Sequence, residues 1–111
     1  MAVSVVSKGS LLMTGSEQSL LSTPEQTPGI YVLVVDANVM AGSDVLVLRL
    51  KEKVTVGGTS RTRRKLTTAA GAQDPAILEL GPIEISYEFQ ATLQQTAGTN
   101  RTFDWEIRRI G

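Results

Sequence analysis

Alternation of apolar and polar side chains is the feature that most constrains the fold of this chain, and it is clearest in IEISYEFQATL, residues 83–93. A period of two is the repeat of a β-strand, and a polar half indicates that one face meets water. One solvated face is typical of an antiparallel sheet. The pattern therefore predicts one antiparallel strand over residues 83–93. Its inward side chains are Ile83, Ile85, Tyr87, Phe89, Ala91 and Leu93.

The next stretch, QQTAGTNRTFDWEI at residues 94–107, continues the alternation after a polar turn. Gly98 and Asn100 are residue types that tolerate the positive φ of a hairpin loop. Phe103, Trp105 and Ile107 then alternate with polar residues. We therefore expect a β-hairpin that places Phe103 and Trp105 beside the apolar face of the preceding strand.

Further strands are indicated on both sides of a charged stretch. GIYVLVVD, residues 29–36, is apolar on both faces, as a central strand would be, and SDVLVLRLKEKVTV follows it at residues 43–56. TSRTRRKLTTA, residues 59–69, is expected at a sheet edge, because charged side chains are costly in a core and common on edge strands. AILELG, residues 76–81, predicts a short strand that ends at Gly81-Pro82.

The length and composition of the chain allow one domain. A chain of 111 residues has room for one hydrophobic core, and with 5% aromatic residues that core consists mainly of Val, Leu and Ile. We predict an all-β fold, an antiparallel β-sandwich or a jelly-roll-like barrel of about seven or eight strands, over residues 27–111. Residues 1–26 are rich in Ser, Thr, Gln, Pro and Gly, and form either an extended amino-terminal arm or the first strands.

Two residue types that most enzyme and metal sites use do not occur in this sequence. There is no Cys and no His, which argues against disulfides, structural zinc and nucleophilic sites that use a His base. The formal net charge is +0, which disfavours non-specific binding to nucleic acid. No stretch is apolar for the roughly 20 residues of a membrane span, and the first residues lack the pattern of a signal peptide. We expect a non-enzymatic, soluble and unexported protein without a cofactor or a membrane partner.

The dense run of basic residues in the predicted outer strand comprises Arg61, Arg63, Arg64 and Lys65. These cations could meet phosphate or an acidic protein surface. No aromatic residues interleave with them to stack on bases, which favours a solvated edge strand or a contact between subunits over nucleic acid. We therefore take these four residues as a candidate protein interface.

Two other groups invite a chemical interpretation and have a simpler structural one. The carboxylates Glu84, Glu88, Asp104 and Glu106 would share one face of the expected hairpin and suggest a calcium site or a glycosidase pair. The polar face of an antiparallel sheet carries such residues by default. Trp105 and Tyr87 would form a sugar-binding platform if they faced solvent, but their alternation with charged neighbours places them in the core.

Two segments resemble small structural proteins of tailed bacteriophages. In residues 27–51, GIYVLVVD leads to a short M-A-x-x-D turn and a strand that contains LRLK. In residues 89–110, ATLQQTAGTNRTFDWEI is similar to the TLxQTAGTxRxFxW ending of such proteins. The resemblance implies a virion component made in the bacterial cytoplasm, a capsid cement or decoration protein that binds the outer surface of the major capsid protein lattice, often as a homotrimer.

Two other functions remain open on the sequence. A head-tail connector, tail or baseplate component would share the composition and the fold class. A carbohydrate- or ligand-binding β-sandwich module would require an exposed aromatic side chain at Tyr31, Tyr87 or Trp105.

Overall fold

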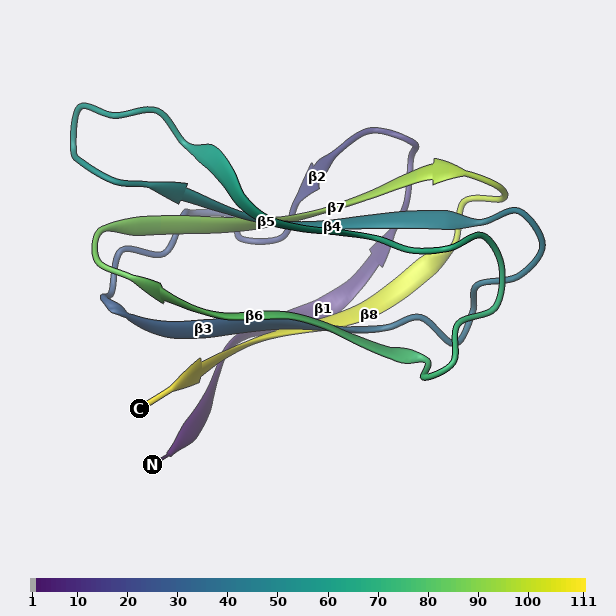
Figure 1. Cartoon of the computed structure of the whole chain (residues 1–111), viewed down its shortest axis with the longest axis horizontal. Coiled ribbons are helices and arrows are strands. Elements are labelled where there is room, and N and C mark those ends of the chain that lie inside the picture. Colours follow the sequence, from purple (N-terminus) through teal and green to yellow (C-terminus); the bar gives the residue numbers. More distant parts are fainter. Residues whose placement is uncertain (1) are drawn as a thin grey trace.

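The computed structural model describes residues 2–111, and in that range it contains strands and no helix (Figure 1). The strands are β1 (Val3–Leu12), β2 (Gln18–Ser19), β3 (Gly29–Asp36), β4 (Val45–Lys53), β5 (Arg61–Thr67), β6 (Ile77–Ile85), β7 (Glu88–Ala97) and β8 (Thr102–Ile110). They form two four-stranded antiparallel sheets, with the orders β1-β8-β3-β6 and β2-β7-β4-β5. The predicted all-β sandwich is confirmed.

The strand order identifies the sandwich as a jelly roll. β1 pairs with β8, β2 with β7, β3 with β6 and β4 with β5, as in one long hairpin whose tip is the loop at residues 54–60. Rolling up such a hairpin places most consecutive strands in opposite sheets, which is the architecture of the eight-stranded jelly roll. The two sheets lie face to face and enclose the core (Figure 1).

The prediction of one continuous strand over residues 83–93 is wrong. β6 ends at Ile85 in one sheet, Ser86 and Tyr87 form a bend, and β7 begins at Glu88 in the other sheet. The alternation runs on across the bend because both strands direct their apolar side chains into the same core from opposite sides. A period of two reports which side faces the core and does not report a change of sheet.

The prediction of a β-hairpin over residues 94–107 is also wrong. β7 and β8 lie in different sheets, and β8 pairs with β1 and β3 instead. The segment between them is an arch that connects the two layers, and Phe103 and Trp105 still face the core, as predicted. Among residues 2–111, β4 and β5 are the one pair of consecutive strands that form a hairpin.

Strand β3 is central in its sheet, between β8 and β6, as its apolar faces predicted. Its neighbour β6 does not end at Gly81-Pro82 as expected but continues to Ile85. The pairing with β3 shifts between Tyr31 and Leu33, which leaves Gly81 and Pro82 at a bulge. Proline is tolerated there because β6 is an edge strand, so its missing N–H interrupts no second ladder.

An extended amino-terminal segment is not confirmed. Residues 3–12 form β1, which pairs along its length with β8, and Gln18 and Ser19 form β2 against β7. A further bridge joins Glu25 to Phe89. Residues 2–26 therefore contribute the first strands of the sandwich.

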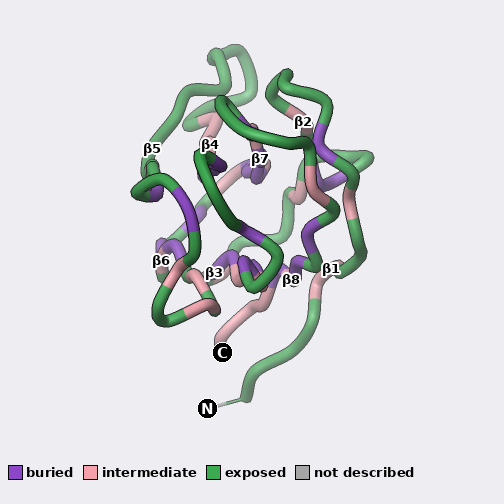
Figure 2. Tube along the Cα trace, turned by 90° about the vertical axis from the view of Figure 1, so that its right-hand side faces the viewer, coloured by how far each residue is buried: buried purple, intermediate pink, exposed green. Residues whose placement is uncertain are grey.

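The core lies between the sheets, where buried residues from both layers meet (Figure 2). The rings of Tyr31 and Phe89 pack across it with centroids 4.4 Å apart, and the Tyr31 hydroxyl donates to the Thr27 carbonyl. Trp105 contributes from β8 and is 9% exposed. No helix in the described range is long and apolar enough to cross a lipid bilayer.

Candidate interaction surface

The basic run predicted at a sheet edge lies on β5, which pairs only with β4 and forms the outer edge of its sheet. β4, the loop at residues 54–60 and β5 together form a projecting hairpin, which extends beyond the sandwich at the upper left of Figure 1. Its loop exposes Val54 and Val56, at 69% and 77%. The projecting hairpin therefore presents an apolar tip followed by a basic strand.

The four basic residues of β5 are not equivalent. Arg63 donates to the Glu52 carboxylate at 3.0 Å and to the backbone carbonyl and carboxylate of Glu84 on β6. The hydrogen bond from Arg63 is the largest cause that lowers the pKa of Glu84, and it raises the pKa of Arg63. Arg63 thus links the edges of the two sheets and belongs to the fold. In contrast, Arg61, Arg64 and Lys65 are exposed and form no salt bridge within the described part of the chain.

The outer face of the β1-β8-β3-β6 sheet has an apolar end near the chain termini. Adjacent strands place Val3 beside Ile110 and Ile110 beside Ile30. Val5 follows on β1, and Val3, Val5 and Ile30 are exposed. These side chains, Val3, Val5, Ile30 and Ile110, form the apolar patch. An exposed apolar group of this kind is a common mark of a protein interface.

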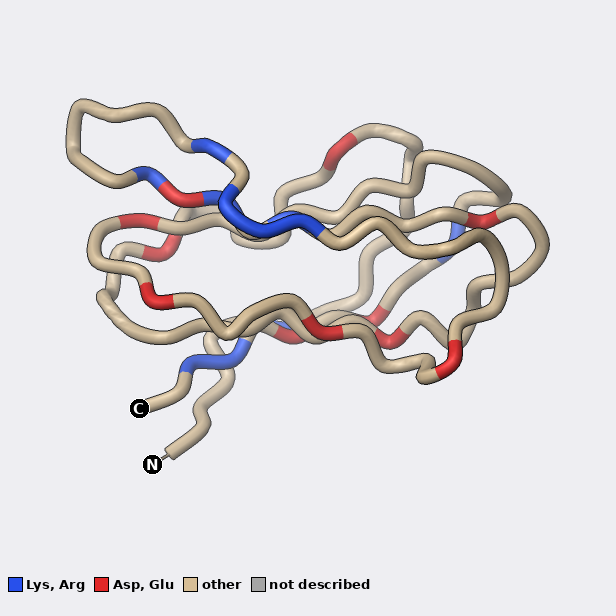
Figure 3. The backbone as a smooth tube through the Cα atoms, viewed as in Figure 1, with Lys and Arg blue, Asp and Glu red and all other residues tan. Residues whose placement is uncertain are grey.

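The other end of the same face is hollowed and acidic. A cleft of about 520 Å³ is lined by Asp36, Asp104 and Glu106, with Val34 and Ile77 among the other lining residues, and we call it the acidic cleft. Lys8 and Ser10 lie on its β1 side, and Arg108 donates to Glu106 at 2.6 Å. Figure 3 shows acidic residues along this sheet and basic residues along β5 on the opposite one. Basic residues are therefore concentrated on β5 and carboxylates on the outer face of the opposite sheet, which also carries Lys8 and Arg108 (Figure 3).

The four carboxylates that the sequence grouped on one face are divided between surfaces. Glu88 lies on β7 in the other sheet, where Lys53 Nζ is 3.6 Å from its carboxylate. Glu84 is bound by Arg63, which leaves Asp104 and Glu106 on the outer face of their sheet. Within residues 2–111 no three such side chains come together to hold a metal ion. The structure gives no geometric support for a calcium site or a glycosidase pair at these residues.

The aromatic side chains offer little surface for stacking on a sugar ring. Tyr31 and Trp105 are buried, and Tyr87, in the bend between β6 and β7, is half-buried. Core packing of Trp105 is thus the interpretation that the structure supports. The expected inward position of Tyr87 holds only in part.

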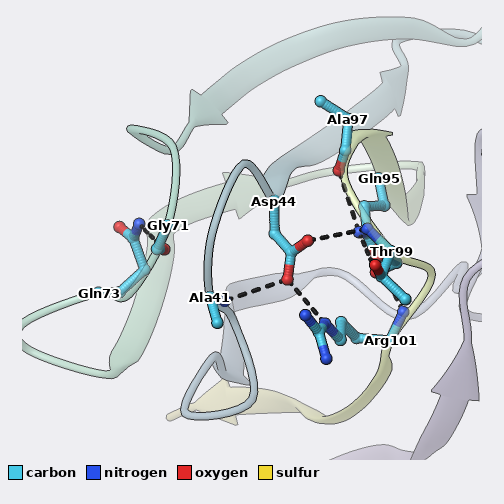
Figure 4. Close-up of polar contacts among 8 residues, drawn as sticks. All are labelled: Ala41, Asp44, Gly71, Gln73, Gln95, Ala97, Thr99 and Arg101. Carbon is cyan, nitrogen blue, oxygen red and sulfur yellow. Dashed lines mark hydrogen bonds and ion pairs between the residues drawn. The ribbon is translucent and has the colours of Figure 1, made fainter.

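A buried polar network joins the two segments that carry the phage resemblance (Figure 4). Asp44, next to β4, accepts hydrogen bonds from the Ala41 N–H at 3.1 Å, the Thr99 N–H at 2.9 Å and Arg101 Nε at 2.7 Å. Its backbone carbonyl accepts from the Gly71 N–H. Three connecting loops at one end of the sandwich therefore converge on Asp44.

The largest cause that lowers the pKa of Asp44 is the hydrogen bond from Ala41, and Arg101 and Thr99 act in the same direction against the effect of burial. Gln95 completes the network: its amide donates to the carbonyls of Ala97 and Thr99, and its oxygen accepts from the Arg101 N–H at 3.0 Å. Both carboxylate oxygens of Asp44 and both the nitrogen and the oxygen of the Gln95 amide are bonded within the network. These contacts tie the loops to one another, which is a structural role.

Sequence reasoning identified Asp44 only as a turn residue and missed Gln95. A signal for Gln95 exists, since it stands two positions after the inward Leu93 of a strand, where another inward side chain is due. The sequence around Asp44 does not indicate its partners, because Asp44 and Thr99 are far apart in the sequence.

Comparison with models of known protein families gives no match, and no curated protein matches the sequence.

Proposed function

We propose that this chain is a non-enzymatic structural component of a tailed-bacteriophage virion, a cement or decoration protein that binds the outside of the major capsid lattice. The proposal begins from the resemblance of residues 27–51 and 89–110 to such proteins. The jelly roll is compatible with it, since viral capsid domains use this fold, but lectins and cupins use it too. A fold alone does not assign a function.

The observation that carries the proposal is how the two resembling segments meet. They supply β3, β4, β7 and β8, the inner strands of both sheets. The M-A-x-x-D turn ends in Asp44, and the TAGTxR motif supplies the Thr99 and Arg101 groups that bind it. The resemblance therefore covers one connected part of the fold, which supports the proposal.

The proposed mechanism is geometric. A small domain at a junction of the lattice adds buried area between neighbouring capsid subunits, and repetition by symmetry multiplies weak contacts into a strong clamp. In this proposal the exposed cations Arg61, Arg64 and Lys65 belong to an interface between proteins of the assembly, whereas Arg63 supports the strand that carries them.

Co-sedimentation with empty shells of a tailed-phage major capsid protein, in the compact and the expanded form, tests the proposal. We expect the protein to pellet with expanded shells at a fixed ratio of copies to capsid subunits. A protein that stays in the supernatant with both forms contradicts a cement role. Gold labelling of particles that contain the protein separates the capsid surface from a connector, tail or baseplate position.

A further inference from the structure

We propose that the projecting hairpin of one copy binds the outer face of the β1-β8-β3-β6 sheet of a second copy, with the apolar tip on the apolar patch and Arg61 and Arg64 of β5 in the acidic cleft. The inference deepens the proposed function, on which it rests for its biological setting, because it names a partner for Arg61 and Arg64. These two residues share one face of β5, opposite Glu52 and Leu50, whereas Lys65 is opposite Arg49 on the other face. The contacts that support it do not depend on the proposed function and concern self-association alone.

Both surfaces carry the same two features in the same order. Along the projecting hairpin, exposed Val54 and Val56 are followed by the cations of β5. Along the outer face of the other sheet, the apolar patch is followed by the acidic cleft. Apolar groups therefore meet apolar groups when cations meet carboxylates.

The lengths of the two surfaces also match. Strands advance by about 3.3 Å per residue, so the distance along β5 from Arg61 to Arg64 is about 10 Å. The distance along β3 from Ile30 to Asp36 is about 20 Å by the same rule. The hairpin tip adds further reach in front of Arg61. The projecting hairpin can thus cover both the apolar patch and the acidic cleft at once.

The acidic cleft places two like charges directly opposite each other. Asp36 and Asp104 are direct cross-strand neighbours on β3 and β8, and like charges in that position destabilise a sheet. Ser10 donates to Asp104 and the Asn38 N–H donates to Asp36, but within the described residues neither carboxylate has a cationic partner. A guanidinium between them would remove the repulsion.

The acidic cleft suits a long basic side chain. Val34 and Ile77 line it beside the carboxylates, so the aliphatic stem of Arg or Lys can pack on apolar surface while its charged head meets oxygen. Lys8 and Arg108 supply two positive charges beside the three carboxylates Asp36, Asp104 and Glu106, so negative charge remains in excess. The charge of β5 on a neighbouring copy complements that excess.

The contact joins two different surfaces of the same chain, so it is heterologous. A heterologous contact closes into a ring when its rotation allows and otherwise continues as a chain.

A charge-swap experiment on the full chain tests the inference. Variant A carries Arg61→Glu with Arg64→Glu, and variant B carries Asp36→Lys with Asp104→Lys. Sedimentation velocity over a concentration series measures self-association of each variant, of wild type and of an equimolar mixture. Circular dichroism and Trp105 emission verify that each variant is folded. Matched controls that keep the charge are Arg61→Lys with Arg64→Lys, and Asp36→Glu with Asp104→Glu.

We expect wild type and both controls to associate. Variants A and B should associate at least about tenfold more weakly, because like charges would then face each other. In the mixture every contact between variant A and variant B has opposite charges again, so the two variants associate with each other more tightly than either does alone. If variant B misfolds, Val54→Ser with Val56→Ser provides a second test and weakens association without changing charge.

Three results would overturn the inference: a monomeric wild type throughout the series, variants that associate as tightly as wild type, or a mixture no tighter than its components. Shell binding is measured separately. Self-association without shell binding contradicts only the proposed function, and shell binding without charge-dependent self-association contradicts only the present inference.

Discussion

Arg101 Nε donates a hydrogen bond of 2.7 Å to Asp44 Oδ2 and thereby joins the arch between β7 and β8 to the turn before β4. The two residues belong to different connections between the sheets, and the Thr99 N–H binds the other carboxylate oxygen. This end of the sandwich is consequently held by side-chain contacts as well as by strand pairing.

Gly98→Ala should destabilise the protein by about 2 kcal/mol or more, as expected for a strained backbone combined with a clash. Gly98 has a φ of 88°, and a Cβ there would lie 2.0 Å from Asp44 Oδ1. Urea unfolding measures the loss. Gly15→Ala is the matched control, because Gly15 has a φ of 90° with open space around it. Equal losses at the two positions would show that the contact with Asp44 is not tight.

The stability contributed by ionised Asp44 should be lost in acid. Its pKa is lower in the folded protein than in the unfolded chain, so this contribution is complete above the unfolded value of about 3.9 and disappears as the pH falls through the folded pKa. Urea midpoints of wild type and Asp44→Asn, measured from neutral to acidic pH, should converge below pH of about 4. A constant difference between them would contradict this role.

The acid dependence that remains in Asp44→Asn comes from other groups. Glu17 and Glu84 also have lowered pKa values, with hydrogen bonds from Thr92 and Arg63 as the largest causes. Both contributions have the same sign as that of Asp44. The variant should therefore still lose stability in acid, with a shallower slope.

Tyr31→Phe should cost about 1 kcal/mol, because it removes the hydroxyl that donates to the Thr27 carbonyl and leaves that carbonyl without this partner. The ring contact with Phe89 is retained. Tyr87→Phe is the control, since Tyr87 is half-buried and its hydroxyl makes no hydrogen bond within residues 2–111. Urea unfolding should separate the two variants, and equal stability of both would show that the Tyr31 hydroxyl contributes nothing.

Trp105 should emit as a buried indole. It is 9% exposed and packs in the core, so iodide should quench the native protein weakly and the urea-unfolded protein strongly. As the chain has one Trp, the emission reports this position alone. Strong quenching of the native protein would place the indole at the surface and favour a ligand-binding module.

Arg63→Ser should lower the thermal midpoint more than Arg61→Ser or Arg64→Ser. Arg63 bonds to Glu52 on β4 and to Glu84 on β6, so it connects β5 to both strands. Arg61 and Arg64 have no such partners in the described range. The difference should shrink in high salt, because exposed ion pairs are screened. If all three variants have the same midpoint, the link between the sheet edges does not contribute to stability.

The sequence by itself determined the strand character of this chain and the side chains that face its core. Phe89, Leu93, Phe103 and Ile107 are buried as the alternation predicted, and β5 is the charged outer strand. These properties follow from local patterns, since a strand shows its inward face with a period of two and an edge tolerates charge.

Only the tertiary structure decided which strands pair. Both sheets face one core, so the inward pattern of β6 and β7 is the same whether they form one strand or lie in opposite layers. The pairing of β1 with β8 and the contact of Asp44 with Arg101 join the ends of long chain segments. Such contacts depend on the closure of the whole roll, and no local spacing of residues encodes them.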